Sequence, residues 1–281
     1  MNAIMVAVNY TDLLAITLPY NRHHFEDMWI VTDHASHLGI CQILADTGIK
    51  AGTHVTDAFY RNGATFNKWL ALEEGLDAMG REGWICLMDA DVLWPKSLQV
   101  RDQYETLKMW NGDGPTTYID QGQLCTPRRR MWAEWPSLPP FGCNWNQRYG
   151  EPMALPLEQD WTSFPLHRQE REFAGYSQIF HANDPVLGPV PWHQADWKHA
   201  GGADSFFQQK WPAERKVRPP FEVLHLGPAG QNWVGRATPL VDGTVLPGSA
   251  ERLDYSGRRL WAERRANRAA GRDQFDGERL K

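Results

Sequence analysis

The stretch WICLMDAD, residues 84–91, places two aspartates directly after an apolar run. The run has the length and character of a buried strand, so Asp89 and Asp91 are expected at its carboxyl end. Open α/β sheets bind their ligands at this edge. Buried unpaired carboxylates are costly, and two of them together favour a divalent cation or strong hydrogen-bond donors nearby. The alternative is an ordinary strand exit with solvated acids, because a short motif of this kind often occurs without function.

Strand-like and helix-like segments alternate through the N-terminal part of the chain. Short apolar runs occupy residues 4–9, 28–32, 54–59 and 84–88. Between the last two, residues 66–79 place their apolar side chains at helical spacing and their acids on the other side. This alternation predicts an α/β fold with a mostly parallel central sheet flanked by helices.

Residues 112–165 have a different texture, with frequent Gly, Pro and Trp and little helical periodicity. Long irregular stretches inside a domain usually build or cover a site, so we expect a loop-rich insertion on the acceptor side. Within and after it, residues 118–125 are expected to contain a strand and residues 169–179 to begin a helix. The sequence therefore predicts one domain over residues 1–250 and a basic, partly helical tail over residues 251–281.

Composition excludes several classes of protein. The chain has 281 residues and a net charge of −5, which argues against a dedicated nucleic-acid module. Six arginines within residues 258–272, and the cluster Arg128–Arg130, nevertheless admit contacts with the phosphates of a donor or of a nucleic acid. The alternative for the tail is a solvated terminal segment.

The remaining composition predicts a cytoplasmic protein with free thiols. The four cysteines are far apart and form no Cys-x-x-Cys pair, so neither a zinc site nor a disulfide framework is indicated. No apolar stretch is long enough to span a bilayer, and no basic region precedes the first apolar run.

Three further features accompany the acid pair. Asp204 follows Gly201-Gly202-Ala203 and precedes a helix-like segment, so it either caps that helix or lies in a tight, backbone-lined site. His225 ends a short strand-like run, and an imidazole beside two carboxylates suits manganese. Asn67 and Lys68 begin the helix-like segment 66–79, where phosphate or ribose would meet a helix N-terminus.

In order and spacing, these features resemble the GT-A fold of nucleotide-sugar-dependent glycosyltransferases over about residues 3–236. The resemblance implies that Asp89 faces the ribose or the metal, that Asp91 binds the metal, and that His225 is a further metal ligand. It also implies that Asp204 contacts the acceptor and, if the reaction inverts the anomeric centre, removes its proton. The fold expected from it is a single GT-A-like, Rossmann-like domain.

The resemblance also implies a donor pocket. Its expected residues are Tyr10 and Asp12 after the first strand, Asp33 after the second, Asn67, Lys68, Asp89 and Trp233. Trp233 follows His225-x-Gly227 as in retaining, glycogenin-like members, although the Lys-Pro of their motif is absent. Inverting members commonly have two adjacent acids where this chain has Ala203-Asp204, so both stereochemical outcomes stay open.

The resulting expectation is a metal-dependent glycosyltransferase of the hexosyltransferase type. The cofactor would be Mn²⁺ or Mg²⁺, the donor a UDP-sugar, and the acceptor a hydroxyl on a carbohydrate or on a modified DNA base. One alternative is a nucleotidyltransferase with the same metal site, although the glycine-rich loop of that class is missing after Val8. Another is a non-catalytic protein that binds carbohydrate or nucleic acid, with Asp89 and Asp91 as calcium ligands and tryptophans as stacking surfaces.

Overall fold

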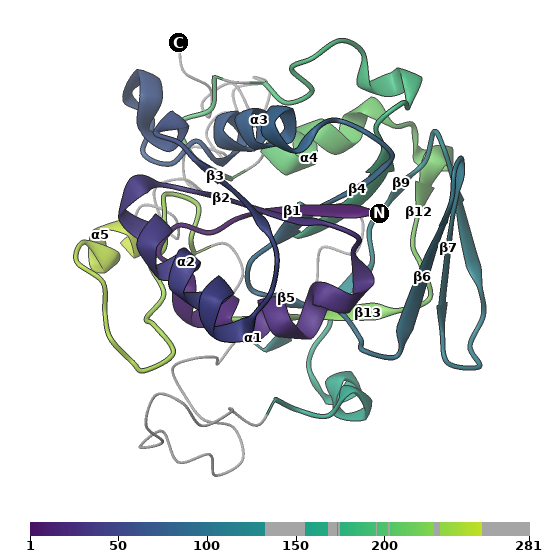
Figure 1. Ribbon diagram of the computed structural model, residues 1–281, viewed down its shortest axis with the longest axis horizontal. Coiled ribbons are helices and arrows are strands. Elements are labelled where there is room, and N and C mark those ends of the chain that lie inside the picture. Colours follow the sequence, from purple (N-terminus) through teal and green to yellow (C-terminus); the bar gives the residue numbers. More distant parts are fainter. Residues whose placement is uncertain are drawn as a thin grey trace, which may run out of the picture.

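A computed structural model describes residues 1–132, 155–167, 173, 175–194, 196–201, 203–227 and 231–254. Within them the chain forms a mixed α/β, Rossmann-like fold in which helices flank a seven-stranded, mostly parallel sheet (Figure 1). The strand order is β12-β9-β11-β4-β1-β2-β3, and only β11 runs against the others. The strands of this sheet are β1 (Asn2–Val6), β2 (Met28–Thr32), β3 (Gly52–Val55), β4 (Trp84–Asp89), β9 (Leu124–Cys125), β11 (Ser177–His181) and β12 (Lys216–Val217).

The strands β1 and β4 are buried on both faces, which explains their uninterrupted apolar sequences. Because side chains alternate along a strand, Met5 of β1 and Cys86 of β4 belong to the core on one face of the sheet. Ile4 and Leu87, one residue along, belong to the core on the other face. The chain order reverses between β1 and β4, so the carboxyl ends of these two strands form the crevice where open α/β sheets bind ligands.

Helices cover the two faces of the sheet (Figure 1). Those on one face are α1 (Thr11–Asn21) and α2 (His34–Thr47), and those on the other are α3 (Lys68–Met79) and the short α4 (Ala203–Phe207). The predicted helix over residues 66–79 corresponds to α3. Asn67, the residue before α3, caps the helix, because its side chain accepts a hydrogen bond from the Leu70 amide at 3.1 Å.

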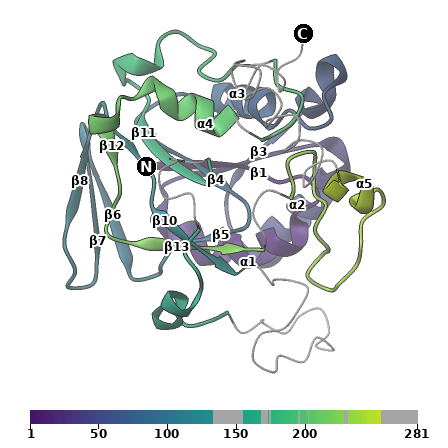
Figure 2. The ribbon, with the colours of Figure 1, turned by 180° about the vertical axis from the view of Figure 1, so that it is seen from behind.

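Two smaller sheets complete the described part of the chain. One has the order β10 (Arg128–Trp132), β13 (Glu222–Leu226), β5 (Val92–Leu93), and it lies against the side of the molecule that carries α1 (Figure 2). The other is an antiparallel meander of β6 (Leu98–Gln103), β7 (Thr106–Asn111) and β8 (Thr117–Asp120). A last helix, α5, spans Ser249–Asp254.

Two expectations from the sequence are wrong in this region. Arg128–Trp132 forms β10 instead of irregular loop, because a five-residue strand has too little periodicity to be recognised, whereas the strand expected within residues 118–125 is present as β8 and β9. Ser177–His181 is a strand and not part of a helix: it pairs antiparallel with β4 and is buried throughout. Tertiary pairing here overrides the local sequence pattern.

Other boundaries shift by a few residues. The first strand ends at Val6 instead of Asn9, and the third begins at Gly52 and is followed by a 3-10 helix over Ala58–Gly63. Cys41, Cys86 and Cys125 are free thiols, and Cys143 lies outside the described residues. No helix in the described ranges is both long and apolar enough to cross a bilayer. The basic tail beyond residue 254 also lies outside them.

Candidate metal centre

The turn that follows β4 carries the acid pair, and α1 holds it in place. Thr17 donates a hydrogen bond to the carbonyl of Ala90 at 2.7 Å. Asn21 donates to the carbonyl of Val92 at 2.7 Å and accepts from the amide of Trp94 at 2.9 Å. Both α1 side chains are buried, so the backbone around Asp89 and Asp91 is fixed by polar contacts that water cannot replace.

His225 reaches the acid pair through strand pairing. In the antiparallel pair of β13 with β5, His225 lies opposite Val92, the residue after Asp91, and the Leu226 amide donates to the Asp91 carbonyl at 2.8 Å. One ligand atom from each of Asp89, Asp91 and His225 lies within 4.8 Å of the others. The three side chains predicted as metal ligands are therefore brought together.

The protonation pattern of this cluster suits a cation. His225 Nδ1 lies 3.1 Å from the Gly227 carbonyl, to which it can donate a proton, and Nε2 lies 3.7 Å from Asp91 Oδ1, where it could bind a metal. Asp91 Oδ1 is buried and has no hydrogen-bond partner within the described ranges. Burial raises the pKa of Asp91, His225 opposes the rise, and Asp89 adds to it. Two carboxylates and an imidazole this close together form a ligand set suited to a divalent metal, whose charge would stabilise the buried ionised Asp91.

Lys68 lies beside the cluster at the start of α3. Its ammonium forms an ion pair with Asp89, and its side chain is only 14% exposed. Burial acts to lower the pKa of Lys68, but Asp89, Asp204 and Asp91 outweigh it and the pKa is raised. The group therefore stays charged at neutral pH and adds a fixed cation to the site.

Arg129 is a second cation that sequence reasoning placed only within a general arginine cluster. Its guanidinium stacks over the Tyr176 ring at 4.4 Å, and Nη2 lies 3.3 Å from the His167 ring. Burial lowers the pKa of Arg129, while Tyr176 and the carboxylates of the site oppose that shift. The two-residue periodicity of β10 is the signal that could have singled it out, since Arg129 must face away from Arg128 and Arg130.

Asp204 lies next to these cations but not as a helix cap. It is the second residue of α4, and its Oδ2 accepts a hydrogen bond at 2.7 Å from the amide of Gly175, in another segment. A Cβ on Gly175 would lie 2.5 Å from the Asp204 Cβ, so only glycine fits this close approach. The interpretation of Asp204 as a helix cap is therefore wrong. Of the two alternatives, the structure has the carboxylate in a tight site lined by backbone.

Tyr10 and Trp233 border the same region. Asn232 donates a hydrogen bond to the Tyr10 hydroxyl at 2.6 Å, and burial together with Asp91 raises the pKa of Tyr10 well above its usual value. A Cβ on Gly201 would lie 2.7 Å from the Trp233 ring, so this ring packs directly on the loop that precedes α4. Gly202 lies outside the described residues.

The other residues that were predicted to bind the sugar donor form contacts that hold the fold together. Asp12 forms a buried ion pair with Arg236, and its Oδ2 also accepts from the Val241 amide at 2.7 Å. Asp33 caps α2 through the Ser36 amide at 2.8 Å and accepts from the Tyr60 hydroxyl at 2.9 Å. Together with Asn67 at the start of α3, these side chains shape the local fold around the site.

Comparisons with known proteins do not identify a family for this chain. No family model matches the chain, and no curated protein matches it. Among solved structures, it is similar to an active-site mutant of LgtC, with 16% sequence identity and a TM-score of 0.28. The match covers 37% of this chain and 40% of that one, so it spans less than half of either protein.

Proposed function

We propose that this chain is a metal-dependent glycosyltransferase of the GT-A type, which moves a sugar from a nucleoside-diphosphate sugar to a hydroxyl acceptor. The observation that carries the proposal is the cluster of Asp89, Asp91 and His225 at the switch point of the sheet, in which the buried Asp91 Oδ1 accepts no hydrogen bond from any residue of the described ranges. Asp89, Asp91 and His225 would hold Mn²⁺ or Mg²⁺, which acts as a Lewis acid toward the diphosphate.

The cations beside the cluster fit the charge that the reaction develops. Loss of the diphosphate from the anomeric carbon leaves negative charge on the leaving group and oxocarbenium character on the sugar. Lys68 and Arg129, both held near the carboxylates, would bind the leaving phosphates and stabilise that charge without reorganising. Tyr10, at the carboxyl end of β1, would lie on the nucleotide side of the donor.

Asp204 is the proposed general base if the reaction inverts the anomeric centre. Its carboxylate is oriented by the Gly175 amide, and it would accept the proton of the acceptor hydroxyl as that hydroxyl attacks the sugar. Asp204→Asn should lower turnover by about a hundredfold or more and leave donor affinity nearly unchanged. Steady-state kinetics and donor titration separate the two effects. Full turnover in this variant would contradict the base role and would favour a retaining reaction.

A nucleotide-sugar panel tests the proposed function. The protein is incubated with UDP-, GDP- and other nucleotide sugars and manganese, and released nucleoside diphosphate is measured with carbohydrate and hydroxymethylated-DNA acceptors. The expected result is diphosphate release that requires the metal and is lost in Asp91→Asn but kept in the exposed control Asp113→Asn. Exchange of pyrophosphate without diphosphate release would indicate a nucleotidyltransferase, and binding without either product would indicate a non-catalytic protein.

A further inference from the structure

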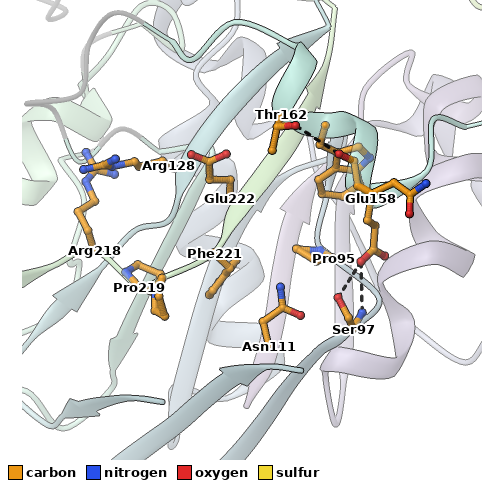
Figure 3. A pocket seen from close by; sticks show the side chains of 13 residues that line it. Pro95, Ser97, Asn111, Arg128, Glu158, Thr162, Arg218, Pro219, Phe221 and Glu222 are labelled. Carbon is orange, nitrogen blue, oxygen red and sulfur yellow. Dashed lines mark hydrogen bonds between the residues drawn. The ribbon is translucent and has the colours of Figure 1, made fainter. Parts of the chain in front are cut away.

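A pocket lies away from the metal centre, between the meander and the β10–β13 pair (Figure 3). Its volume is about 670 Å³, within the range of sites that enclose a small molecule. The lining combines two arginines, polar groups and apolar walls. The lining residues that matter here are Arg128, Arg218, Glu158, Asn111, Trp161 and Phe221.

This pocket is on the other face of β10 and β13 from the metal centre. Arg128 lies opposite Glu222 in the parallel register, and both line the pocket. Arg129 and His225, at the alternate positions of the two strands, belong to the metal centre. A ligand in the pocket would therefore not touch the proposed metal ligands.

Neither acid that lines the pocket forms an ion pair with Arg128. Glu222 pairs with Arg130 instead. Glu158 accepts hydrogen bonds from the Ser97 hydroxyl at 2.7 Å and the Tyr20 hydroxyl at 2.9 Å. These donors are neutral, so Glu158 keeps its negative charge, but it lies at the opposite end of the pocket from Arg128 (Figure 3).

Arg128 is the uncompensated charge. Its side chain is exposed, and it forms no hydrogen bond or ion pair with any other residue of the described ranges. Arg218 lies at the same end of the pocket, because it donates to the carbonyl of Pro127, the residue before Arg128, at 3.1 Å (Figure 3). Its guanidinium also stacks over the Phe173 ring at 4.1 Å, so little side-chain entropy would be lost when it binds an anion.

The rest of the lining indicates what accompanies the anionic group. Trp161 and Phe221, each about 4% exposed, give the pocket apolar walls. Asn111 and Glu158 provide an amide and carboxylate oxygens that bind hydroxyl groups. We propose that this pocket binds an anionic, hydroxylated small molecule, such as a sugar acid or sugar phosphate, with its carboxylate or phosphate on Arg128 and Arg218. This site is independent of the proposed glycosyl transfer.

Isothermal titration of the metal-free protein at low salt tests the proposal. The probes are glucuronate and inorganic phosphate, which separate the two anionic groups, and glucose as the neutral comparison. We expect at least one anionic probe to bind and glucose to bind more weakly. Loss of one charge-assisted contact in Arg128→Ala should weaken the anionic probe about tenfold, and Arg128→Glu should abolish its binding.

A control variant locates the site. Arg101→Ala removes an exposed strand arginine outside the pocket and should leave binding unchanged. Equal binding by the wild type and Arg128→Ala, loss of binding in Arg101→Ala, or no binding of either anion to the wild type would overturn the proposal. Arg128-dependent binding of a DNA oligonucleotide, without binding of either small anion, would overturn it in favour of a phosphodiester ligand.

Discussion

Replacing Asp91 with asparagine should change stability in opposite directions with and without metal. In the metal-free protein, Asp91 is 6% exposed and its Oδ1 accepts no hydrogen bond from the described residues. Burial raises its pKa, which means that the ionised form is destabilised there. Asparagine removes this charge at nearly constant shape, so the metal-free variant should be as stable as the wild type or more stable, by about 1 kcal/mol.

With manganese present, the order should reverse. A ligand that binds only the folded state at a hundred times its Kd adds about 2.7 kcal/mol to the free energy of unfolding. The wild type should gain this increment, whereas Asp91→Asn loses one of its two carboxylate ligands and should gain little. The sign change separates a metal ligand from an acid that merely supports the fold, because removing a supporting acid destabilises the protein in both conditions.

Urea unfolding in EDTA and in excess manganese measures both quantities on the same samples. Asp113→Asn, an exposed turn residue, is the control for the loss of one negative charge and should behave as the wild type. The reasoning would be refuted if Asp91→Asn were clearly destabilised in EDTA and still gained the full increment from manganese.

Three further changes test the packing around the site. His24 is buried, and burial lowers its pKa to about 3. The unfolded chain takes up a proton at this residue below about pH 6.5 and the folded protein does not, so the free energy of unfolding falls on acidification. His24→Phe should remove about 2 kcal/mol of the change in that free energy between pH 7 and 5, measured by urea unfolding at both pH values. An unchanged pH dependence would contradict this. Asp12→Asn should cost about 3 kcal/mol because it leaves the buried Arg236 unpaired, and a thermal transition close to that of the wild type would contradict it. Alanine favours a helix more than glycine does, but Gly75→Ala should still lower the free energy of unfolding by about 1 kcal/mol, since the added Cβ would lie 2.3 Å from the Val31 side chain. A urea midpoint above that of the wild type would show instead that the helix shifts to make room.

The sequence indicates the architecture of the first half well, for a physical reason. The strands β1, β2 and β4 are buried on both faces and read as apolar runs, and α3 has clear helical spacing between them. Parallel strands end at one edge, so the place of Asp89 and Asp91 follows from the alternation alone. Their function as metal ligands stays a prediction.

The remaining features depend on contacts between residues far apart in the chain. His225 reaches Asp91 because β13 pairs with the two-residue strand β5, which has no pattern of its own. Arg236 pairs with Asp12 although the two residues are 224 positions apart in the chain, and no local pattern indicates this contact. Side chains of a strand alternate between its two faces, so the face on which Arg129 lies can be predicted only once Arg128–Trp132 is known to be a strand.

The central claim is that Asp89, Asp91 and His225 hold a divalent cation that binds a nucleoside diphosphate. Anomalous diffraction from a crystal grown with manganese and UDP tests this most directly. We expect one anomalous peak within coordinating distance of both carboxylates and of His225 Nε2, with diphosphate oxygens completing the coordination, and no such peak for Asp91→Asn. A wild-type crystal with UDP bound and no metal between these three side chains would contradict it.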